Sequence, residues 1–255
     1  MTENTDGGAH GRAPSPPPSP AAGKGVTLNS LAALRDFIPR GPERPKGPDT
    51  SLARAVFPWL AARIATRRRE NLPVSEASLR ADVALGFAAQ VGEGTVWPEA
   101  LYGDENGPRL NLLVRQPEPK QRIAVACQYP RRAGPGQLPQ TARQFGDLLR
   151  DALRLARAFD RADDLPLQVL LCTDEFRTYL AALHPPLRLL RADAVEGEMR
   201  IDLPLAELAE GALTRLADAV TDEHTTLHLA VEVLGYAPVG PLHLGTWRVV
   251  EAHPS

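Results

Sequence analysis

The amino-acid sequence predicts an α/β domain in which a mixed β-sheet is flanked by helices on both faces. Several segments carry apolar residues at helical spacing, and short apolar runs of strand length lie between them. The order of these segments adds a third observation. A predicted hairpin is followed by a long helix and then by a buried strand, and such a crossover makes part of the sheet parallel.

Composition narrows the class of protein. The chain has 255 residues, of which 43% are hydrophobic and 24% charged, as in ordinary soluble globular proteins. The formal net charge of −2 provides no global basic field for nucleic acid or anionic lipid, so a basic surface would have to be local. The start of the chain lacks the features of a secretion signal, and no run approaches the roughly 18 apolar residues of a membrane helix. We therefore expect a cytoplasmic protein with no membrane partner.

The first 49 residues are predicted to be a tail. Residues 1–25 are mostly Gly, Pro, Ser and Ala, which offer little to bury, so we expect disorder there. The run VTLNSLAALRDFIP (26–39) could form one short amphipathic helix. The prolines of 41–49 end it, because proline cannot donate a helix hydrogen bond. Residues 50–255 are then expected to form a single α/β domain.

Two helices are expected next, over 51–70 and 75–90. The first has apolar residues at helical spacing, and Pro58 marks a point where it could kink or restart. In the second, Ser75 can act as the N-cap and Glu76 stands in the first turn.

Strand-like segments follow at 95–102, 109–114 and 122–129, and the last two are predicted to pair as an antiparallel hairpin. An amphipathic helix is expected over 141–159 and a fully buried strand over 165–173.

The C-terminal part begins with a helix over 173–183, for which Thr173 would be the cap. Residues 200–205 fit a strand or the entry to a helix over 205–220. Residues 225–236 fit a strand, with a helix as the alternative, and 243–252 fit a final alternating strand.

The cysteines and histidines give no clear metal site. Cys127 and Cys172 both stand in apolar strand-like runs, which favours buried, unreactive thiols over a disulfide or a reactive pair. His224 and His228 are four residues apart, a spacing that could place both on one helix face. If this segment is a strand they cannot act in that way, and a chance pair is the favoured interpretation.

Five segments carry a resemblance to a known family. They occur in the order RADVALGF, RLNLLV, IAVACQYPR, ARQFGDLLRDALRLA and LPLQVLLCTDEF. This succession resembles the PD-(D/E)xK restriction-endonuclease-like superfamily over residues 51–183, about half of the chain. The resemblance implies a helix bearing a Glu, strands bearing an Asp and a Glu-x-Lys pair, and cleavage of phosphodiesters with Mg²⁺. A hard cation needs the anionic oxygens of those carboxylates, and the Lys helps to activate the attacking water.

The residues at these positions depart from that pattern. The helix acid is Glu76, with Asp82 as a competitor, whereas the strand Asp, Glu and Lys positions hold Asn111, Ala126 and Gln128. Without both inner carboxylates useful Mg²⁺ affinity should be lost, so we expect no metal, no cofactor and no cleavage at this site.

Further residues belong to the same interpretation. Gln144 falls on the crossover helix, where some members place a polar residue, although it could equally be solvated. A migrated Mg²⁺ site is the alternative, built from Glu93, Glu99 or Asp104. In a purely structural interpretation, Asn111, Ala126 and Gln128 only pack or bond the backbone.

Arginines could supply a local phosphate-binding surface, although each could also belong to a solvated face. The candidates are Arg67, Arg68, Arg69, Arg131, Arg132 and Arg143. The sequence thus favours a catalytically degenerate nuclease-like domain that binds nucleic acid or serves as a protein scaffold or regulatory subunit. The alternatives are a metal-dependent nuclease with a rearranged site and a protein-interaction module that uses residues 1–49.

Overall fold

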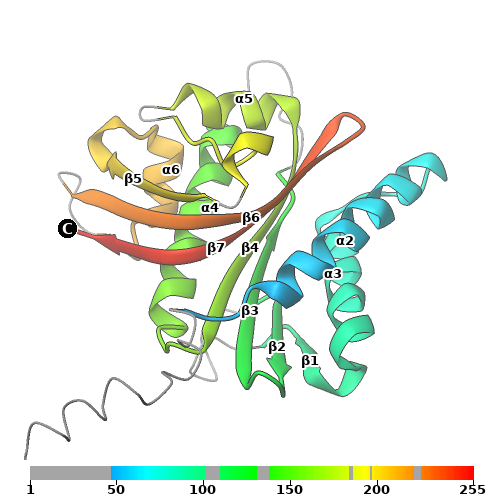
Figure 1. The fold of residues 1–255 in the computed structure, drawn as a ribbon. Coiled ribbons are helices and arrows are strands. Elements are labelled where there is room, and N and C mark those ends of the chain that lie inside the picture. Colours follow the sequence, from blue (N-terminus) through cyan, green and yellow to red (C-terminus); the bar gives the residue numbers. More distant parts are fainter. Residues whose placement is uncertain (1–46, 101–109, 131–137, 184–185, 196, 221–224) are drawn as a thin grey trace, which may run out of the picture. The chain divides into compact units, whose positions relative to one another are not determined.

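A seven-stranded mixed sheet organises the part of the chain that the computed structural model describes (Figure 1). That part comprises residues 47–100, 110–130, 138–183, 186–195, 197–220 and 225–255, which belong to one compact unit, Pro45–Ser255. The predicted tail helix, Asp104, Arg131 and Arg132 lie outside these residues.

The strand order in the sheet is β1-β2-β3-β4-β7-β6-β5. The strands are β1 (Val96–Pro98), β2 (Leu112–Gln116), β3 (Gln121–Gln128), β4 (Asp164–Thr173), β5 (Glu198–Pro204), β6 (Thr226–Val239) and β7 (Leu242–Pro254). β3 and β4 pair in parallel, and every other neighbouring pair is antiparallel. The mixed sheet predicted from the hairpin and the crossover is confirmed.

Helices cover both faces of this sheet. The five α-helices of the described residues are α2 (Ser51–Arg69), α3 (Glu76–Val91), α4 (Leu138–Ala158), α5 (Asp174–Ala182) and α6 (Glu210–Leu216). Single 3-10 turns span Glu93–Thr95, Ala192–Ala194 and Leu205–Glu207. α2 and α3 pack on one face and α4, α5 and α6 on the other, with a separate apolar core under each set. None of the described helices is both long and apolar enough to cross a membrane.

The parallel pair β3–β4 is buried on both sides because it lies between these two cores. Ile123 and Val125 of β3 belong to the core under α2 and α3, whereas Ala124 and Ala126 belong to the core under α4. All but the last residue of β4 is buried. Successive residues along a strand face opposite sides of the sheet. A strand that is buried on both sides therefore has a near-continuous apolar sequence, as β3 and β4 do.

Several local predictions are confirmed. Ser75 caps α3, since its hydroxyl accepts a hydrogen bond from the backbone N–H of Ser78 at 3.1 Å. β2 and β3 form the expected antiparallel hairpin. The segment expected at 225–236 lies within the strand β6 except for its first residue, and 200–205 lies within or just beyond β5. Both cysteines are buried and free.

Other local predictions are wrong. The helix expected over 205–220 begins as a 3-10 turn, and α6 covers only Glu210–Leu216. The helical path is interrupted at Leu208 and Ala209, whose backbone is extended. Thr173 precedes α5 but its side chain makes no capping hydrogen bond. Pro58 lies inside a single helix, α2.

A buried ion pair joins α2 to α3. The carboxylate of Asp82 is 1% exposed and accepts hydrogen bonds from Nε of Arg67 at 2.5 Å and Nη2 of Arg67 at 3.0 Å. Nε of Arg63 lies 3.4 Å from the same carboxylate. Two donors in a fork match the two carboxylate oxygens, so the charge of Asp82 is compensated where water is excluded.

We expect the substitution Arg67→Ala to lower the free energy of unfolding by about 3 kcal/mol, because it leaves the buried carboxylate of Asp82 with the distant Arg63 alone. Urea denaturation measures this loss. Arg69→Ala is the matched control: Arg69 is exposed at the end of the same helix, and its loss should change stability by about 0.5 kcal/mol or less. Equal losses in the two variants would contradict a structural role for the Arg67–Asp82 pair.

Candidate functional site

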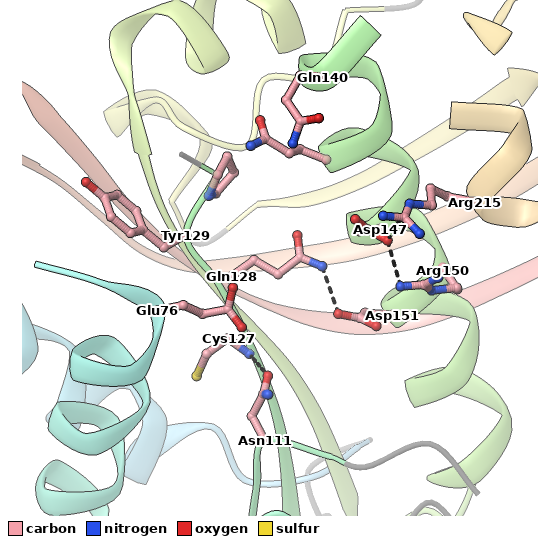
Figure 2. Close-up of a pocket in the computed structure, with 12 residues that line it drawn as sticks. Glu76, Asn111, Cys127, Gln128, Tyr129, Gln140, Asp147, Arg150, Asp151 and Arg215 are labelled. Atoms are coloured by element: carbon pink, nitrogen blue, oxygen red, sulfur yellow. Dashed lines mark hydrogen bonds and ion pairs between the residues drawn. The ribbon is translucent and has the colours of Figure 1, made fainter. Parts of the chain in front are cut away.

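A polar pocket of about 390 Å³ lies at the carboxyl end of β3 (Figure 2). Its walls come from the start of α3, the residue before β2, the end of β3, one face of α4, and α6. The lining residues are Glu76, Asn111, Cys127, Gln128, Tyr129, Pro130, Gln140, Gln144, Asp147, Arg150, Asp151 and Arg215.

The fold explains why polar side chains gather at this edge. β3 and β4 are parallel, so their carboxyl ends lie at the same edge of the sheet, and α4 is the crossover between them. Gln140, Gln144, Asp147 and Asp151 follow one another at three- and four-residue spacing on α4, which places them on one helix face. The apolar residues of α4 face the sheet, so this polar row forms one side of the pocket.

The structure brings four of the five predicted site residues together. Glu76, Asn111, Gln128 and Gln144 all line the pocket. Ala126 does not: it is 2% exposed and packs in the apolar core under α4.

Each side chain at a position expected to serve metal chemistry is bonded within the protein. The side-chain oxygen of Asn111 accepts a hydrogen bond from the backbone N–H of Cys127 at 2.6 Å, and Nε2 of Gln128 donates to Oδ2 of Asp151 at 2.8 Å. Both contacts are drawn in Figure 2. Glu76 forms an ion pair with Arg80 on the next turn of α3. The oxygen that Asn111 could offer to a cation is therefore already engaged.

Asp151 was missed by the sequence interpretation. Desolvation at the pocket wall raises the pKa of its carboxyl, while the hydrogen bond from Gln128 and the charges of Arg150 and Arg154 act in the opposite direction. The sequence feature that could have indicated Asp151 is the row of polar residues along one face of this amphipathic helix. It could not be assigned to a site, because solvent-facing residues give the same pattern.

Asp147, Arg150 and Arg215 were also missed. Oδ1 of Asp147 accepts a hydrogen bond from Nη2 of Arg150 at 2.6 Å and lies 3.4 Å from Nε of Arg215. This three-residue cluster links α4 to α6. The cluster lies on the side of the pocket opposite Glu76 (Figure 2). With Glu76 and Asp151 included, the lining has three carboxylates and two guanidinium groups, so the pocket carries no excess of positive charge.

The arginines predicted from the sequence lie elsewhere. Arg67 is paired with Asp82, as described above. Arg68, Arg69 and Arg143 are exposed, but none of them lines this pocket. The cations at the pocket are instead Arg150 and Arg215.

The residues named for a migrated metal site do not meet here either. Glu93 and Glu99 follow α3 and β1 and do not line the pocket. Across the described ranges, no group of three or more His, Cys, Asp or Glu side chains is arranged to hold a metal ion. Cys127 offers no nucleophile, since burial raises the pKa of its thiol to about 12 and the thiolate is the reactive form.

Comparison with known proteins assigns no role to this pocket: no protein-family model, curated protein or solved structure matches the chain. Its chemistry follows from its own functional groups. The walls combine carboxamides, which both donate and accept hydrogen bonds, with three carboxylates, two guanidinium groups and one aromatic ring, that of Tyr129. The pocket therefore offers donors, acceptors and charges of both signs.

We expect Asp151→Asn to raise the stability of the fold at neutral pH, because Asn still accepts the hydrogen bond from Gln128 and carries no charge into the desolvated wall. The raised pKa of Asp151 means that the folded state holds its proton more tightly than the unfolded state. The stabilisation that the protonated Asp151 gives to the folded state is thus fully present below the ordinary aspartate pKa of about 3.9. It is lost as pH rises through the folded-state pKa.

Urea denaturation of both proteins between pH 3.5 and pH 8 tests this, and the advantage of Asp151→Asn should grow with pH. Asp147→Asn is the control, since Asp147 is bonded to arginines and its loss should cost up to about 1 kcal/mol. A stability difference for Asp151→Asn that stays constant with pH would contradict a desolvated carboxyl.

Proposed function

We propose that residues 51–183 form a nuclease-like domain without cleavage chemistry, and that the domain binds single-stranded nucleic acid at the pocket beside β3. One observation carries this proposal. Glu76, Asn111 and Gln128 meet at one pocket, as a nuclease-like arrangement requires, and each is bonded to the protein itself.

Support for the nuclease-like arrangement comes from the topology. The succession α3, β1, β2, β3, α4, β4 follows the element order of the PD-(D/E)xK superfamily that the sequence resembles. The antiparallel meander β1-β2-β3 and the parallel addition of β4 are also what a helix crossover after a hairpin produces.

The donor set argues against cleavage. Mg²⁺ is held in nucleases through carboxylate oxygens, but the positions nearest the end of β3 offer the carboxamides of Asn111 and Gln128. Two of the acids that line the pocket are paired with arginines, Glu76 with Arg80 and Asp147 with Arg150 and Arg215. The third, Asp151, accepts a hydrogen bond from the carboxamide of Gln128. A divalent ion at Glu76 or Asp147 would have to compete with these arginines.

The same residues favour binding of a nucleotide. Arg150 and Arg215 can contact a phosphate, since guanidinium groups match phosphate oxygens in a fork. Gln140 and Gln144 present carboxamides of the kind that pair with base edges, and Tyr129 offers a ring on which a base can stack. A volume of about 390 Å³ suits one unpaired base with its sugar and phosphate, which favours single strands over a duplex.

A protein-scaffolding function is the second candidate. Trp59 on α2 and Leu85 on α3 expose 36% and 51% of their surfaces. The ring of Trp59 also packs against α3, since a Cβ on Gly86 would stand 3.0 Å from it. Exposed apolar surface of this kind suits a protein partner.

The deciding experiment is a gel-shift series with end-labelled single- and double-stranded DNA and RNA, in EDTA and again with Mn²⁺. We expect a salt-sensitive shift of single strands without cleavage. Arg150→Ala and Arg215→Ala should each weaken binding about tenfold, as for other phosphate contacts. Arg200→Ala is the matched control, because Arg200 is an exposed arginine on β5 that does not line the pocket.

Cleavage that appears only with Mn²⁺ would contradict the non-cleaving assignment and direct attention to Glu76 and to the migrated set Glu93, Glu99 and Asp104. A shift that survives both pocket substitutions would place the binding surface elsewhere. If no nucleic acid is shifted, the result favours the scaffolding function. A pull-down with and without residues 1–49 would then test the tail as the docking segment.

A further inference from the structure

A second polar cluster lies on the strands at the other end of the sheet, and it does not depend on the proposed function. In the pairing of β5 with β6, Asp202 stands directly opposite His228. In the pairing of β6 with β7, His228 stands directly opposite His253. Glu251 precedes His253 by two residues and so faces the same side. These four side chains form a row across three strands.

A hollow of about 230 Å³ accompanies this row, lined by Arg200, Asp202, His228, Leu229, Ala230, Glu251 and His253. Ala230 lies opposite Glu251 in the register, and its small side chain leaves room between the two histidines and the acid. The imidazoles are exposed to about one third for His228 and one half for His253, so an ion can reach them from solvent.

Each imidazole is held by a carboxylate through one ring nitrogen. Nδ1 of His228 lies 2.7 Å from Oδ1 of Asp202, and Nε2 of His253 lies 2.9 Å from Oε1 of Glu251. A carboxylate accepts a hydrogen bond, so each bond fixes the N–H on that nitrogen and leaves the lone pair of the neutral ring on the other one. The lone pair of His228 is then on Nε2. Nδ1 of His253 lies 3.3 Å from the carbonyl oxygen of Pro254, an acceptor, so this nitrogen either donates an N–H to that oxygen or shares a cation with it.

The two rings are also close enough to share one ion. Their centroids are 5.1 Å apart and their planes are inclined by 39°. Directly opposed residues on antiparallel strands have Cβ atoms about 5 Å apart, so the backbone register itself holds the imidazoles at this separation. The arrangement of carboxylate, imidazole and vacant nitrogen is the one that orients histidine ligands in metal sites.

We propose that His228 and His253 together bind one divalent transition-metal ion of the Zn²⁺ or Cu²⁺ class. Nε2 of His228 and Nδ1 of His253 supply two ligands, Asp202 and Glu251 orient the rings, and water completes the coordination. Imidazole nitrogens suit Zn²⁺ and Cu²⁺ but not Mg²⁺. Because two histidines are fewer than the three protein ligands usual in zinc enzymes, the site would act by cross-linking β6 and β7 and not by catalysis.

The local charge allows a cation here. Asp202 and Glu251 contribute negative charge beside the rings, and Arg200, which also lines the hollow, is 2.9 Å from Glu198 and thus compensated. This assignment replaces the pairing of His224 with His228 considered from the sequence. His228 is on a strand, so its effective neighbour is the residue across the ladder.

Isothermal titration calorimetry of the full, untagged chain with Zn²⁺, Cu²⁺ and Mg²⁺ tests the site. We expect one equivalent of Zn²⁺ and tighter binding of Cu²⁺, following the usual order of affinities, with no binding of Mg²⁺. His228→Asn and His253→Asn should each reduce Zn²⁺ affinity at least tenfold, and Asp202→Asn by about tenfold, as for other orienting carboxylates. Zn²⁺ should also raise the thermal midpoint of the unaltered chain but not of the His228→Asn variant.

His243→Asn is the matched control. His243 does not line the hollow and is held elsewhere by the hydroxyl of Tyr236 at 2.9 Å and by Asp174 at 3.3 Å, so its replacement should leave Zn²⁺ binding unchanged. Circular dichroism of each variant establishes that the fold is retained. Absence of stoichiometric Zn²⁺ binding, or binding that survives both His228→Asn and His253→Asn, would overturn the proposal.

Discussion

The parallel pairing of β3 with β4, buried between two helical layers, is the constraint on which the other features depend. The pairing runs in register from Arg122 opposite Asp164 to Gln128 opposite Leu170. β4 is also bonded to its other neighbours through Gln168, whose carboxamide donates to the carbonyl of Leu148 at 2.8 Å and accepts from the indole of Trp247 at 2.9 Å. One buried polar side chain thereby joins α4, β4 and β7. Since its hydrogen bonds are made in a site without water, replacing it would leave unpaired buried groups.

The pocket follows from that pairing. Two carboxyl ends at one edge bring the end of β3 beside α4, and the polar groups placed there satisfy one another, as buried polar groups must. Asn111 bonds the backbone of β3, Gln128 bonds Asp151, and Asp147 bonds arginines from two helices. These bonds stabilise the walls and reduce what each group can do for a metal ion. The arginines and carboxamides keep further donors, which is the basis of the ligand binding proposed for this pocket.

The histidine row on β5, β6 and β7 shows the opposite outcome of the same rule. There Nδ1 of His228 bonds Asp202, which orients the ring and leaves Nε2 as a ligand atom, whereas His253 has Glu251 at Nε2 and the carbonyl of Pro254 at Nδ1. In the pocket beside β3, one lone pair of the amide oxygen of Asn111 is engaged by the backbone of Cys127. What a hydrogen bond leaves for a ligand depends on which atom it uses.

The sequence by itself determined the elements whose residues are buried in a regular pattern: the continuous apolar run of β4, the helical spacing of α2, α3 and α4, and the cap at Ser75. It also indicated which residues stand at the end of β3, because an alternating or continuous strand pattern fixes the strand end to within a few residues. Only the tertiary structure decided the ambiguous and long-range features. Residues 226–236 became a strand because β5 and β7 pair with them, and the helix expected over 205–220 is interrupted by extended backbone at Leu208 and Ala209. The contacts between Gln128 and Asp151 and between His228 and His253 join residues far apart in the chain. Only strand register and helix placement bring these residues together. The free energy that fixes the register comes from burial of whole strand faces and not from the polar pairs themselves.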